Sequence, residues 1–332
     1  MPESQKISKK LSIAIPTYNR LAYLKECIRS ILSQTFQDFS IFVFDNASDE
    51  PVEEKLKAFN DERIHFIGNN KNTGPPENIN RILKYPFKSK YLTIFHDDDL
   101  MHPKMLEIQT SFLNKNDDLV FVTSDFNQVS SDNIQRFKNI IEEKIKYNIY
   151  KNNYEFTKAT MLWLRCAFDS AMYRTKFIGN STMEHDKFSD FSDLVFLIEI
   201  SQKGPCAFIK APLINYRIHS GQDSRLFKKK YEEGAVEVLS FCRKNLPSVL
   251  NRIEKKLFSK YSLNFLIRAY AYKNNGFLDF LRFMKKCRQK KIIKYGYFRY
   301  IDMRGVVSMI SIILKNKKIL DIARSIQDFY KK

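Results

Sequence analysis

Glycine is scarce in this chain, with nine glycines among 332 residues. A glycine-rich loop that wraps phosphate groups is therefore not the expected binding device, because such loops need several closely spaced glycines. The five cysteines are widely spaced, and none forms a pair separated by two residues. This spacing supports neither a zinc ribbon nor a dithiol redox motif, and it favours reduced thiols in a cytoplasmic protein.

Long apolar segments are also missing from the two ends of the chain. The first ten residues are polar, so we expect no signal peptide there. The longest apolar stretch of the C-terminal part, residues 306–314, is well short of the ~20 residues that cross a bilayer. These observations predict a cytoplasmic chain.

The positive charge is concentrated in the C-terminal third of the chain. Residues 226–332 contain 26 Lys and Arg against 8 Asp and Glu, whereas residues 1–225 contain 30 against 29. A basic segment of this kind suits an anionic partner, such as a membrane surface or a nucleic acid, or it serves as a solubilising face. The charge distribution predicts two parts, residues 1–225 and residues 226–332.

Apolar runs typical of strands alternate with helical patterns through the first part. Strands are expected at residues 11–15, 41–44, 64–67, 91–95, 119–123, 206–209 and 213–216. Helices are expected after an Asn19 cap, near Pro51, over residues 77–83, from Pro103, over residues 193–202 and repeatedly after residue 226. This alternation predicts an α/β fold with a mostly parallel sheet flanked by helices, plus a basic helical C-terminal extension.

Three polar clusters follow the ends of expected strands. They occupy residues 16–20, 45–49 and 96–99. In sheets of this kind, ligands bind beyond the carboxyl ends of the strands. We therefore expect the three clusters to form one binding site.

The densest cluster is the acidic run Asp97, Asp98 and Asp99. A hard cation such as Mg²⁺ or Mn²⁺ would offset the repulsion between these carboxylates and bridge them to a diphosphate. Such a metal would also neutralise charge that develops on a leaving nucleoside diphosphate. The alternative is a solvated acidic turn that caps the helix beginning near Pro103.

Polar residues after the second expected strand offer a second set of contacts. Asp45 can accept hydrogen bonds from a base or a ribose, as acidic residues do in dinucleotide folds, or it can form an Asx turn. For Asp49 we favour a helix N-cap. Further along, Arg81 is expected either near a phosphate or, as the favoured alternative, exposed to solvent.

Four motifs occur in a fixed order, namely IPTYNR at residues 15–20, DNASD at 45–49, NTGPPEN at 72–78, and DDD at 97–99 followed by Pro103. In this order and spacing they resemble the family-2 glycosyltransferases, which have the nucleotide-binding GT-A fold. The resemblance covers roughly residues 10–225. It implies a nucleotide half at about residues 10–124 and an acceptor half at about residues 125–225.

The resemblance implies roles for particular residues. The nucleotide site would comprise Pro16, Thr17, Tyr18, Arg20, Asp45, Asn72 and Asp97. The metal, Mn²⁺ or Mg²⁺, would be held by Asp98, Asp99 and His219. His96 stands where many family members have the first Asp of their DxD motif, so the identity of the direct carboxylate ligand is left open, with Asp98 as the choice.

The resemblance also implies a general base and a reaction. Asp193 matches the catalytic base of the family, with Asp190 as its rival, although Ser192 stands where Glu is common. The reaction would move a hexose or N-acetylhexosamine, with inversion, from a nucleotide-diphospho-sugar to an acceptor hydroxyl. A UDP-sugar donor is expected. The implied acceptor is a glycan or a lipid-linked sugar in bacterial surface polysaccharide or lipopolysaccharide synthesis.

The basic C-terminal region, residues 226–332, is expected to hold the enzyme against the inner face of the plasma membrane. A sugar nucleotidyltransferase is an alternative, but residues 16–20 lack the glycine-rich loop that it needs. A nucleic-acid-binding protein would explain the charge and not the acidic run, so no nucleic-acid partner is expected. A catalytically inactive sugar-nucleotide-binding homologue is a further alternative.

Overall fold

The computed structural model describes residues 9–130, 137, 144–161, 164, 166–179, 181–219, 231–244, 266–267, 270 and 277–289. The chain divides into two compact units, which are described separately. The first unit comprises Met1–Asn153, Arg165–Met183 and Phe196–Gln222, and the second comprises Tyr154–Leu164, Glu184–Val195 and Asp223–Lys332. Two segments that precede residue 225 therefore group with the C-terminal region. The apolar stretch at residues 306–314 lies outside the described residues.

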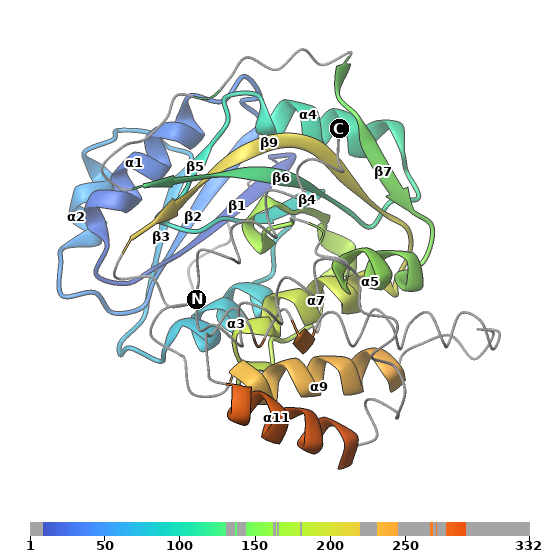
Figure 1. The fold of residues 1–332 in the computed structure, drawn as a ribbon. Coiled ribbons are helices and arrows are strands. Elements are labelled where there is room, and N and C mark those ends of the chain that lie inside the picture. The colour runs from blue at the N-terminus through green and yellow to red at the C-terminus, as the bar shows by residue number, and fades with distance from the viewer. Residues whose placement is uncertain are drawn as a thin grey trace. The chain divides into compact units, whose positions relative to one another are not determined.

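The first unit is built on a nine-stranded sheet flanked by helices (Figure 1). Its strands are β1 (Leu11–Thr17), β2 (Phe39–Asp45), β3 (Ile64–Gly68), β4 (Tyr91–Ile94), β5 (Leu100–Met101), β6 (Phe121–Ser130), β7 (Tyr147–Tyr150), β8 (Met172–Arg174) and β9 (Cys206–Ile218). Its helices are α1 (Leu21–Leu32), α2 (Val52–Lys57), α3 (Pro75–Lys84) and α4 (Met105–Lys115). Helix α7 (Ser192–Ser201) crosses from the second unit into the first.

The strand order confirms the predicted α/β fold with a mixed, mostly parallel sheet. Strands follow the order β3-β2-β1-β4-β8-β6-β9-β5, and β7 also pairs with β9. The pairs along β3-β2-β1-β4 are parallel, and so is the long pairing of β6 with β9. Strand β8 runs antiparallel to both of its neighbours, so the two halves of the sheet differ in character.

Helices cover both faces of the first half of the sheet (Figure 1). Leu24 and Ile28 of α1 pack in one core cluster with Ile13 of β1 and Met105 of α4. These residues follow the 3.6-residue period of a helix and the two-residue period of a strand, which is why each element buries one apolar face. Aromatic residues occupy the other face, where Phe44 meets Tyr85 edge-on with ring centroids 5.4 Å apart, next to α3.

The caps predicted for two helices are wrong. The Asn19 amide donates to the Asp49 carboxylate at 2.8 Å, and the Asp49 backbone N–H donates back to Asn19 at 2.8 Å. This reciprocal pair uses both side chains, so Arg20 and Pro51 are the N-caps of α1 and α2. The Leu21 backbone N–H at the start of α1 donates to the Glu50 carboxylate instead.

The late strands are longer than predicted. Strand β9 is continuous over 13 residues, where two short strands were expected. Ser124 of β6 lies opposite Ile209 of β9, but the next residue, Asp125, lies opposite Pro212. Strand β9 therefore has two extra residues at this point of the pairing. A bulge of this kind absorbs extra residues without ending the pairing, so β9 continues toward residues 217–219.

The described part of the second unit is helical. It includes α5 (Asn153–Met161), α6 (His185–Phe188), the single turn η4 (Ser189–Phe191), α9 (Tyr231–Lys244) and α11 (Phe277–Gln289). A Cβ at Gly234 of α9 would lie 2.4 Å from the Phe188 carbonyl oxygen, so this close approach requires glycine. Among the described helices, none has the length and apolar character of a membrane span.

Candidate active site

The acidic run lies in the turn after β4, beside the end of β1. Because β4 pairs in parallel with β1, the residues that follow the two strands meet at one edge of the sheet. The Thr17 hydroxyl donates a 2.7 Å hydrogen bond to the Asp97 carboxylate. Asp97, Asp98 and Asp99 are buried, and Lys104 is the N-cap of α4. The alternative of a solvated acidic turn capping that helix is therefore wrong.

Arg20 brings a positive charge to two of these carboxylates. Its Nη1 lies 3.4 Å from Asp97 Oδ1 and 3.5 Å from Asp98 Oδ2. Arg20 was predicted to contact the nucleotide, and in the structure it lies at the junction of the IPTYNR and DDD motifs. The structure thus places Thr17, Arg20 and Asp97 together, as the resemblance implied.

Asp98 and His219 are brought together from positions 121 residues apart. Strand β5 pairs antiparallel with β9, Leu100 opposite Asn215, so the end of β9 passes the acidic turn. The His219 Nε2 atom lies 2.9 Å from Asp98 Oδ2. The predicted proximity of these two side chains is present in the structure.

Asp99 is placed differently from Asp98. One of its carboxylate oxygens accepts the backbone N–H of Arg217 at 2.7 Å. The other lies 3.9 Å from His96 Nδ1. His96, Asp99 and Asp169 offer ligand atoms that all lie within 4.8 Å of one another. The structure therefore groups Asp99 with His96 and Asp169, whereas the prediction grouped it with His219.

Burial raises the pKa of Asp97 and of Asp99. Desolvation, followed by the charge of Asp98, raises the pKa of Asp97 to about 7, although Arg20 and Thr17 act in the opposite direction. Desolvation and the neighbouring charges of Asp169 and Asp98 raise the pKa of Asp99 well above its usual value. Carboxylates crowded in this way gain from a nearby cation, which favours their ionised forms.

The donor atoms fit a hard divalent cation. Two adjacent ligands of Mn²⁺ or Mg²⁺ lie about 3 Å apart when each is about 2.1 Å from the ion. The 2.9 Å between Asp98 Oδ2 and His219 Nε2 is a hydrogen bond in this structure, and it is compatible with that spacing. Within the described residues, the buried Asp99 Oδ2 and both carboxylate oxygens of Asp169 accept no hydrogen bond. Buried oxygens without partners are costly, and a cation nearby would offset that cost.

Asp45 lies at the end of β2 in the same edge of the sheet. Its carboxylate accepts the Ser48 hydroxyl at 2.5 Å and the Ser48 backbone N–H at 3.1 Å. Asp45 thus bonds locally, as the alternative implied, although the backbone N–H lies three residues on and not two as in an Asx turn. The backbone N–H of Asn46 donates to the Thr17 carbonyl at 3.0 Å and ties this turn to β1. A carboxylate has about four acceptor positions, so a ligand role for Asp45 stays a prediction.

The remaining predicted nucleotide residues lie around this turn. Pro16 ends β1 together with Thr17, and the Tyr18 side chain that follows is exposed. The Asn72 side-chain oxygen accepts the Asn46 amide and the Gly74 backbone N–H, each at 2.8 Å. Asn72 therefore shapes the turn before α3.

Arg81 is half-buried, not exposed as the favoured alternative predicted, and its contact with a phosphate stays a prediction. Its Nη2 donates to the carbonyl oxygens of Ile67 at 2.8 Å and Gly68 at 2.6 Å. Its Nη1 donates to the Asp45 carbonyl at 3.3 Å. The guanidinium thus closes the carboxyl ends of β2 and β3, because several N–H donors on one plane can bind carbonyls from two strands.

The two candidate bases belong to the second unit. Asp193 lies in the first turn of α7, and its carboxylate accepts the backbone N–H of Leu194 at 2.8 Å. Asp190 lies in η4, where the Ser189 hydroxyl is 3.5 Å from its carboxylate. Because each unit is described by itself, the role of either residue stays a prediction.

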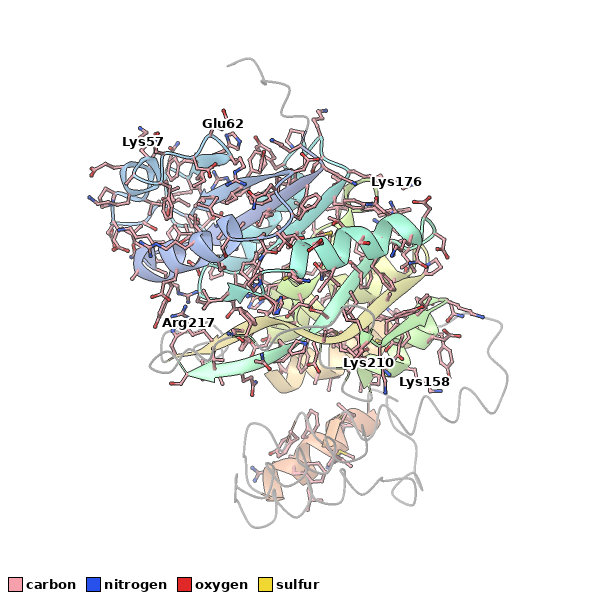
Figure 2. The ribbon with its side chains drawn as sticks, turned by 90° about the horizontal axis from the view of Figure 1, so that it is seen from above. Lys57, Glu62, Lys158, Lys176, Lys210 and Arg217 are labelled. Carbon is pink, nitrogen blue, oxygen red and sulfur yellow. The ribbon has the colours of Figure 1, made fainter. Side chains whose placement is uncertain are left out.

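Several residues at the acidic turn were not predicted. Arg217, labelled near the end of β9 in Figure 2, bonds to the main chain of Asp98 and to Glu26. Arg217 stands two residues before the predicted metal ligand His219, and that position in the sequence is the signal that could have indicated it. Glu26 and Asp169 have no sequence signal, because a single charged residue on a helix or in a turn reads as solvent-exposed.

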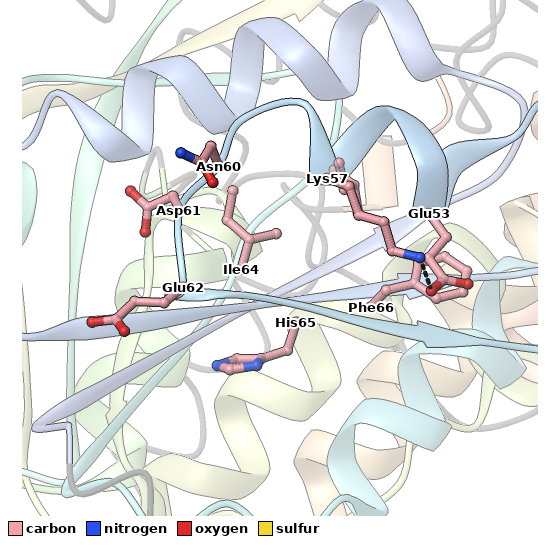
Figure 3. A pocket seen from close by; sticks show the side chains of 9 residues that line it. Glu53, Lys57, Asn60, Asp61, Glu62, Ile64, His65 and Phe66 are labelled. Carbon is pink, nitrogen blue, oxygen red and sulfur yellow. Dashed lines mark ion pairs between the residues drawn. The ribbon is translucent and has the colours of Figure 1, made fainter.

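A separate pocket lies on the surface formed by α2 and the edge strand β3 (Figure 3). Its lining includes Glu53, Lys57 and His65, and Glu53 and Lys57 form an ion pair of 3.0 Å. None of the predicted site residues belongs to this lining. The acidic turn, rather than this pocket, is therefore the candidate active site.

Comparison with known families supports this assignment. The family model of glycosyl transferase family 2 matches residues 12–177, half of the chain. An uncharacterized glycosyltransferase of Rickettsia conorii is 26% identical over 262 residues, which are 78% of this chain and 40% of the relative. The chain therefore spans less than half the length of that relative. An uncharacterized glycosyltransferase of Haemophilus influenzae is 23% identical over 324 residues, 96% of this chain and 94% of the relative.

Other similar proteins carry more specific names. The Escherichia coli protein WfgD, a UDP-Glc:alpha-D-GlcNAc-diphosphoundecaprenol beta-1,3-glucosyltransferase, is 28% identical over 42% of this chain and 53% of its own length. The structure of S. aureus TarS 1-349 in complex with UDP-GlcNAc has a TM-score of 0.58 at 12% identity, covering 95% of this chain and 92% of that chain. The mannosyltransferase PcManGT from Pyrobaculum calidifontis, in complex with GDP-Man and Mn²⁺, has a TM-score of 0.50 at 12% identity, covering 98% and 88%. At these identities the two structures show a shared fold.

Proposed function

Because the chain belongs to glycosyl transferase family 2, we propose that it transfers a sugar from a nucleotide diphosphate to an acceptor hydroxyl. The observation that carries this proposal is the junction at the carboxyl edge of the sheet. There Thr17 and Arg20 bind Asp97, and His219 lies 2.9 Å from Asp98. This edge is where nucleotides bind in α/β sheets, and its donor atoms suit a diphosphate-bound cation.

Asp98 and His219 hold the metal, Mn²⁺ or Mg²⁺, in this proposal. Their two donor atoms lie at the spacing of adjacent ligands on one ion. When bound, the ion stabilises the negative charge that develops on the departing nucleoside diphosphate. Asp99, predicted as a further ligand, accepts the Arg217 backbone N–H and supports the end of β9. A metal role for Asp99 therefore requires its second oxygen, which lies toward His96.

The nucleotide binds along the carboxyl ends of β1 and β2. Pro16, Thr17 and Tyr18 line it from β1, and the Asp45 carboxylate accepts bonds from the base or ribose. Asn72 keeps its predicted place at the same site through its bond to Asn46. A UDP-sugar, carrying a hexose or an N-acetylhexosamine, is the preferred donor, since WfgD is named for UDP-Glc and TarS was captured with UDP-GlcNAc.

Asp193 acts as the general base, with Asp190 as the rival. The base removes the proton of the acceptor hydroxyl while that oxygen forms a bond to the anomeric carbon. The bond from the same carbon to the diphosphate oxygen breaks on the opposite side, so the anomeric configuration inverts. The products are the glycosylated acceptor and a nucleoside diphosphate.

The acceptor is a glycan or a lipid-linked sugar in surface polysaccharide or lipopolysaccharide synthesis. WfgD is named for an acceptor linked to diphosphoundecaprenol, a membrane lipid carrier. A basic region at residues 226–332 would hold a cytoplasmic enzyme at the inner face of the plasma membrane, where such a lipid is found. In this proposal residues 1–225 form the catalytic domain.

A nucleotide-sugar panel tests the proposed reaction. We expect the purified full chain to release nucleoside diphosphate from one donor in the presence of Mn²⁺, and EDTA to abolish that release. Turnover should return when Mn²⁺ is restored. Release of pyrophosphate instead would identify a nucleotidyltransferase. Binding of the donors without turnover in any acceptor mixture would identify an inactive homologue.

Membrane attachment predicts salt-sensitive binding to anionic vesicles. We expect the full chain to sediment with phosphatidylglycerol vesicles at low ionic strength and to be released at about 1 M salt, where screening shortens to ~3 Å. Neutral phosphatidylcholine vesicles are the control. Failure to sediment at low salt would contradict the proposal, and a salt-sensitive complex with DNA or RNA would favour the nucleic-acid alternative.

A further inference from the structure

Arg217 connects the acidic turn to the rest of the sheet. Its backbone N–H donates to the Asp99 carboxylate at 2.7 Å, and its Nε donates to the Asp98 carbonyl at 2.7 Å. The side chain is 2% exposed, so its charge is almost fully removed from water. A buried guanidinium needs a counter-charge in good geometry.

Glu26 of α1 supplies a counter-charge. Its Oε2 accepts a 2.6 Å hydrogen bond from Arg217 Nη2. Tyr23 lies one helical turn earlier on the same face of α1, and its ring is 4.4 Å from the Arg217 guanidinium carbon. Two side chains of α1 therefore hold Arg217 from its outer side, one by charge and one by its ring face.

Tyr23 also contacts His219. The ring centroids of Tyr23 and His219 are 4.9 Å apart. His219 follows Arg217 by two residues, so the position of Arg217 also limits where His219 lies. Arg217 thus links the Asp98 carbonyl to Glu26, and Tyr23 contacts both Arg217 and His219.

We propose that Glu26 is a positioning residue that, through Arg217, sets the spacing between the Asp98 carboxylate and the His219 imidazole. This inference rests on the proposed function, in which that pair holds the metal. Glu26 touches neither the metal nor the sugar, and it acts by fixing the Asp98 carbonyl and the end of β9. Outer partners of this kind orient the ligands of a metal and tune its affinity.

Removing the negative charge of Glu26 would change the contacts of the Arg217 guanidinium. Without the Glu26 carboxylate, the Arg217 guanidinium loses one strong hydrogen-bond acceptor. It can then turn toward the neighbouring Asp98 and Asp99 carboxylates. A shift of that kind changes the 2.9 Å spacing of the ligand pair, and metal geometry is sensitive to such changes. Because the Arg217 charge is buried, removing its partner should also lower the melting temperature, so the deciding quantity is the Mn²⁺ affinity of the variants while they are folded.

Calorimetric titration of Mn²⁺ into the full chain, saturated with UDP, tests the proposal. We expect Glu26→Gln to weaken Mn²⁺ binding about tenfold and Glu26→Ala to weaken it further, with both variants folded at the temperature of the titration. Arg217→Lys is the second variant, since it keeps the charge but loses the forked contact to Glu26 and Asp98. It should weaken Mn²⁺ binding as well.

Glu53→Gln is the matched control, because Glu53 also pairs with a cation from a helix but on the surface formed by α2. Unaltered Mn²⁺ affinity in both Glu26 variants, or a lowered melting temperature with unaltered affinity, would overturn the proposal. A parent chain that binds UDP but no Mn²⁺ would also overturn it. A parent chain that binds no nucleoside diphosphate contradicts the proposed function itself, so the two failures are distinguishable.

Discussion

Replacement of Asp98 by asparagine is expected to lower kcat/KM for sugar transfer by about 10²–10³-fold, the loss typical when one stabilising group of a transition state is removed. The asparagine keeps the size of the side chain but removes the negative charge that lies 2.9 Å from His219. The variant should also lose the Mn²⁺-dependent gain in affinity for the nucleoside diphosphate. Steady-state kinetics and Mn²⁺ titration on the same preparation measure both effects.

Asp117→Asn provides the control for this substitution. Asp117 also pairs with an arginine, Arg174 at 3.3 Å, but its side chain is 85% exposed. Exposed ion pairs contribute little, so this variant should match the parent chain in both assays. An Asp98→Asn variant with unchanged turnover and unchanged Mn²⁺ binding would remove Asp98 from the proposed metal site.

Replacement of Asp193 by asparagine is expected to reduce transfer by about 10²–10⁴-fold, the range typical of a general base. Binding of the nucleotide sugar should be unchanged, because the proposed base acts on the acceptor hydroxyl alone. The signature is thus a fall in kcat with an unaltered dissociation constant for the donor. Single-turnover kinetics and donor titration separate the two quantities.

Asp190→Asn tests the rival base, and Asp186→Asn is the neutral comparison. All three aspartates lie between residues 186 and 193, in or next to α6, η4 and α7. Loss of transfer in Asp190→Asn with full activity in Asp193→Asn would reassign the base. Full activity in both variants would require a base elsewhere in the chain.

Most of the fold could be read from local sequence patterns. The strand-like runs that begin at Leu11 and Ile41 fall inside β1 and β2, and the run from Tyr91 covers β4, because buried parallel strands are continuous apolar runs. The expected junction of Thr17 with Asp97 follows from the parallel topology, since residues after neighbouring strands meet at one edge. The periods of a strand, two residues, and of a helix, 3.6 residues, are set by the backbone. They can therefore be recognised in the sequence without knowing which segments pack against each other.

Local patterns misjudged side chains whose partners come from distant segments. Asn19 had the residue type of a helix cap, but Asp49 binds it across 30 residues. Arg81 was expected to be exposed, but it is half-buried and binds the carbonyls of Ile67 and Gly68. In each case a polar group took the partner that satisfied it best, and that partner was defined by the packing of strands and helices.

The sequence alone determined strands β1 to β4, the order of the motifs and which acidic residues end at one edge of the sheet, but it did not indicate β5, β7 or β8. Tertiary structure decided that the Asp97–Asp99 turn is buried, that Asp99 joins Asp169, and that Arg217 reaches Glu26 across 191 residues. The physical reason is the distance along the chain between the residues that interact. Secondary structure follows from contacts within a few residues, whereas burial and ion pairing depend on segments that meet only after the sheet has closed around them.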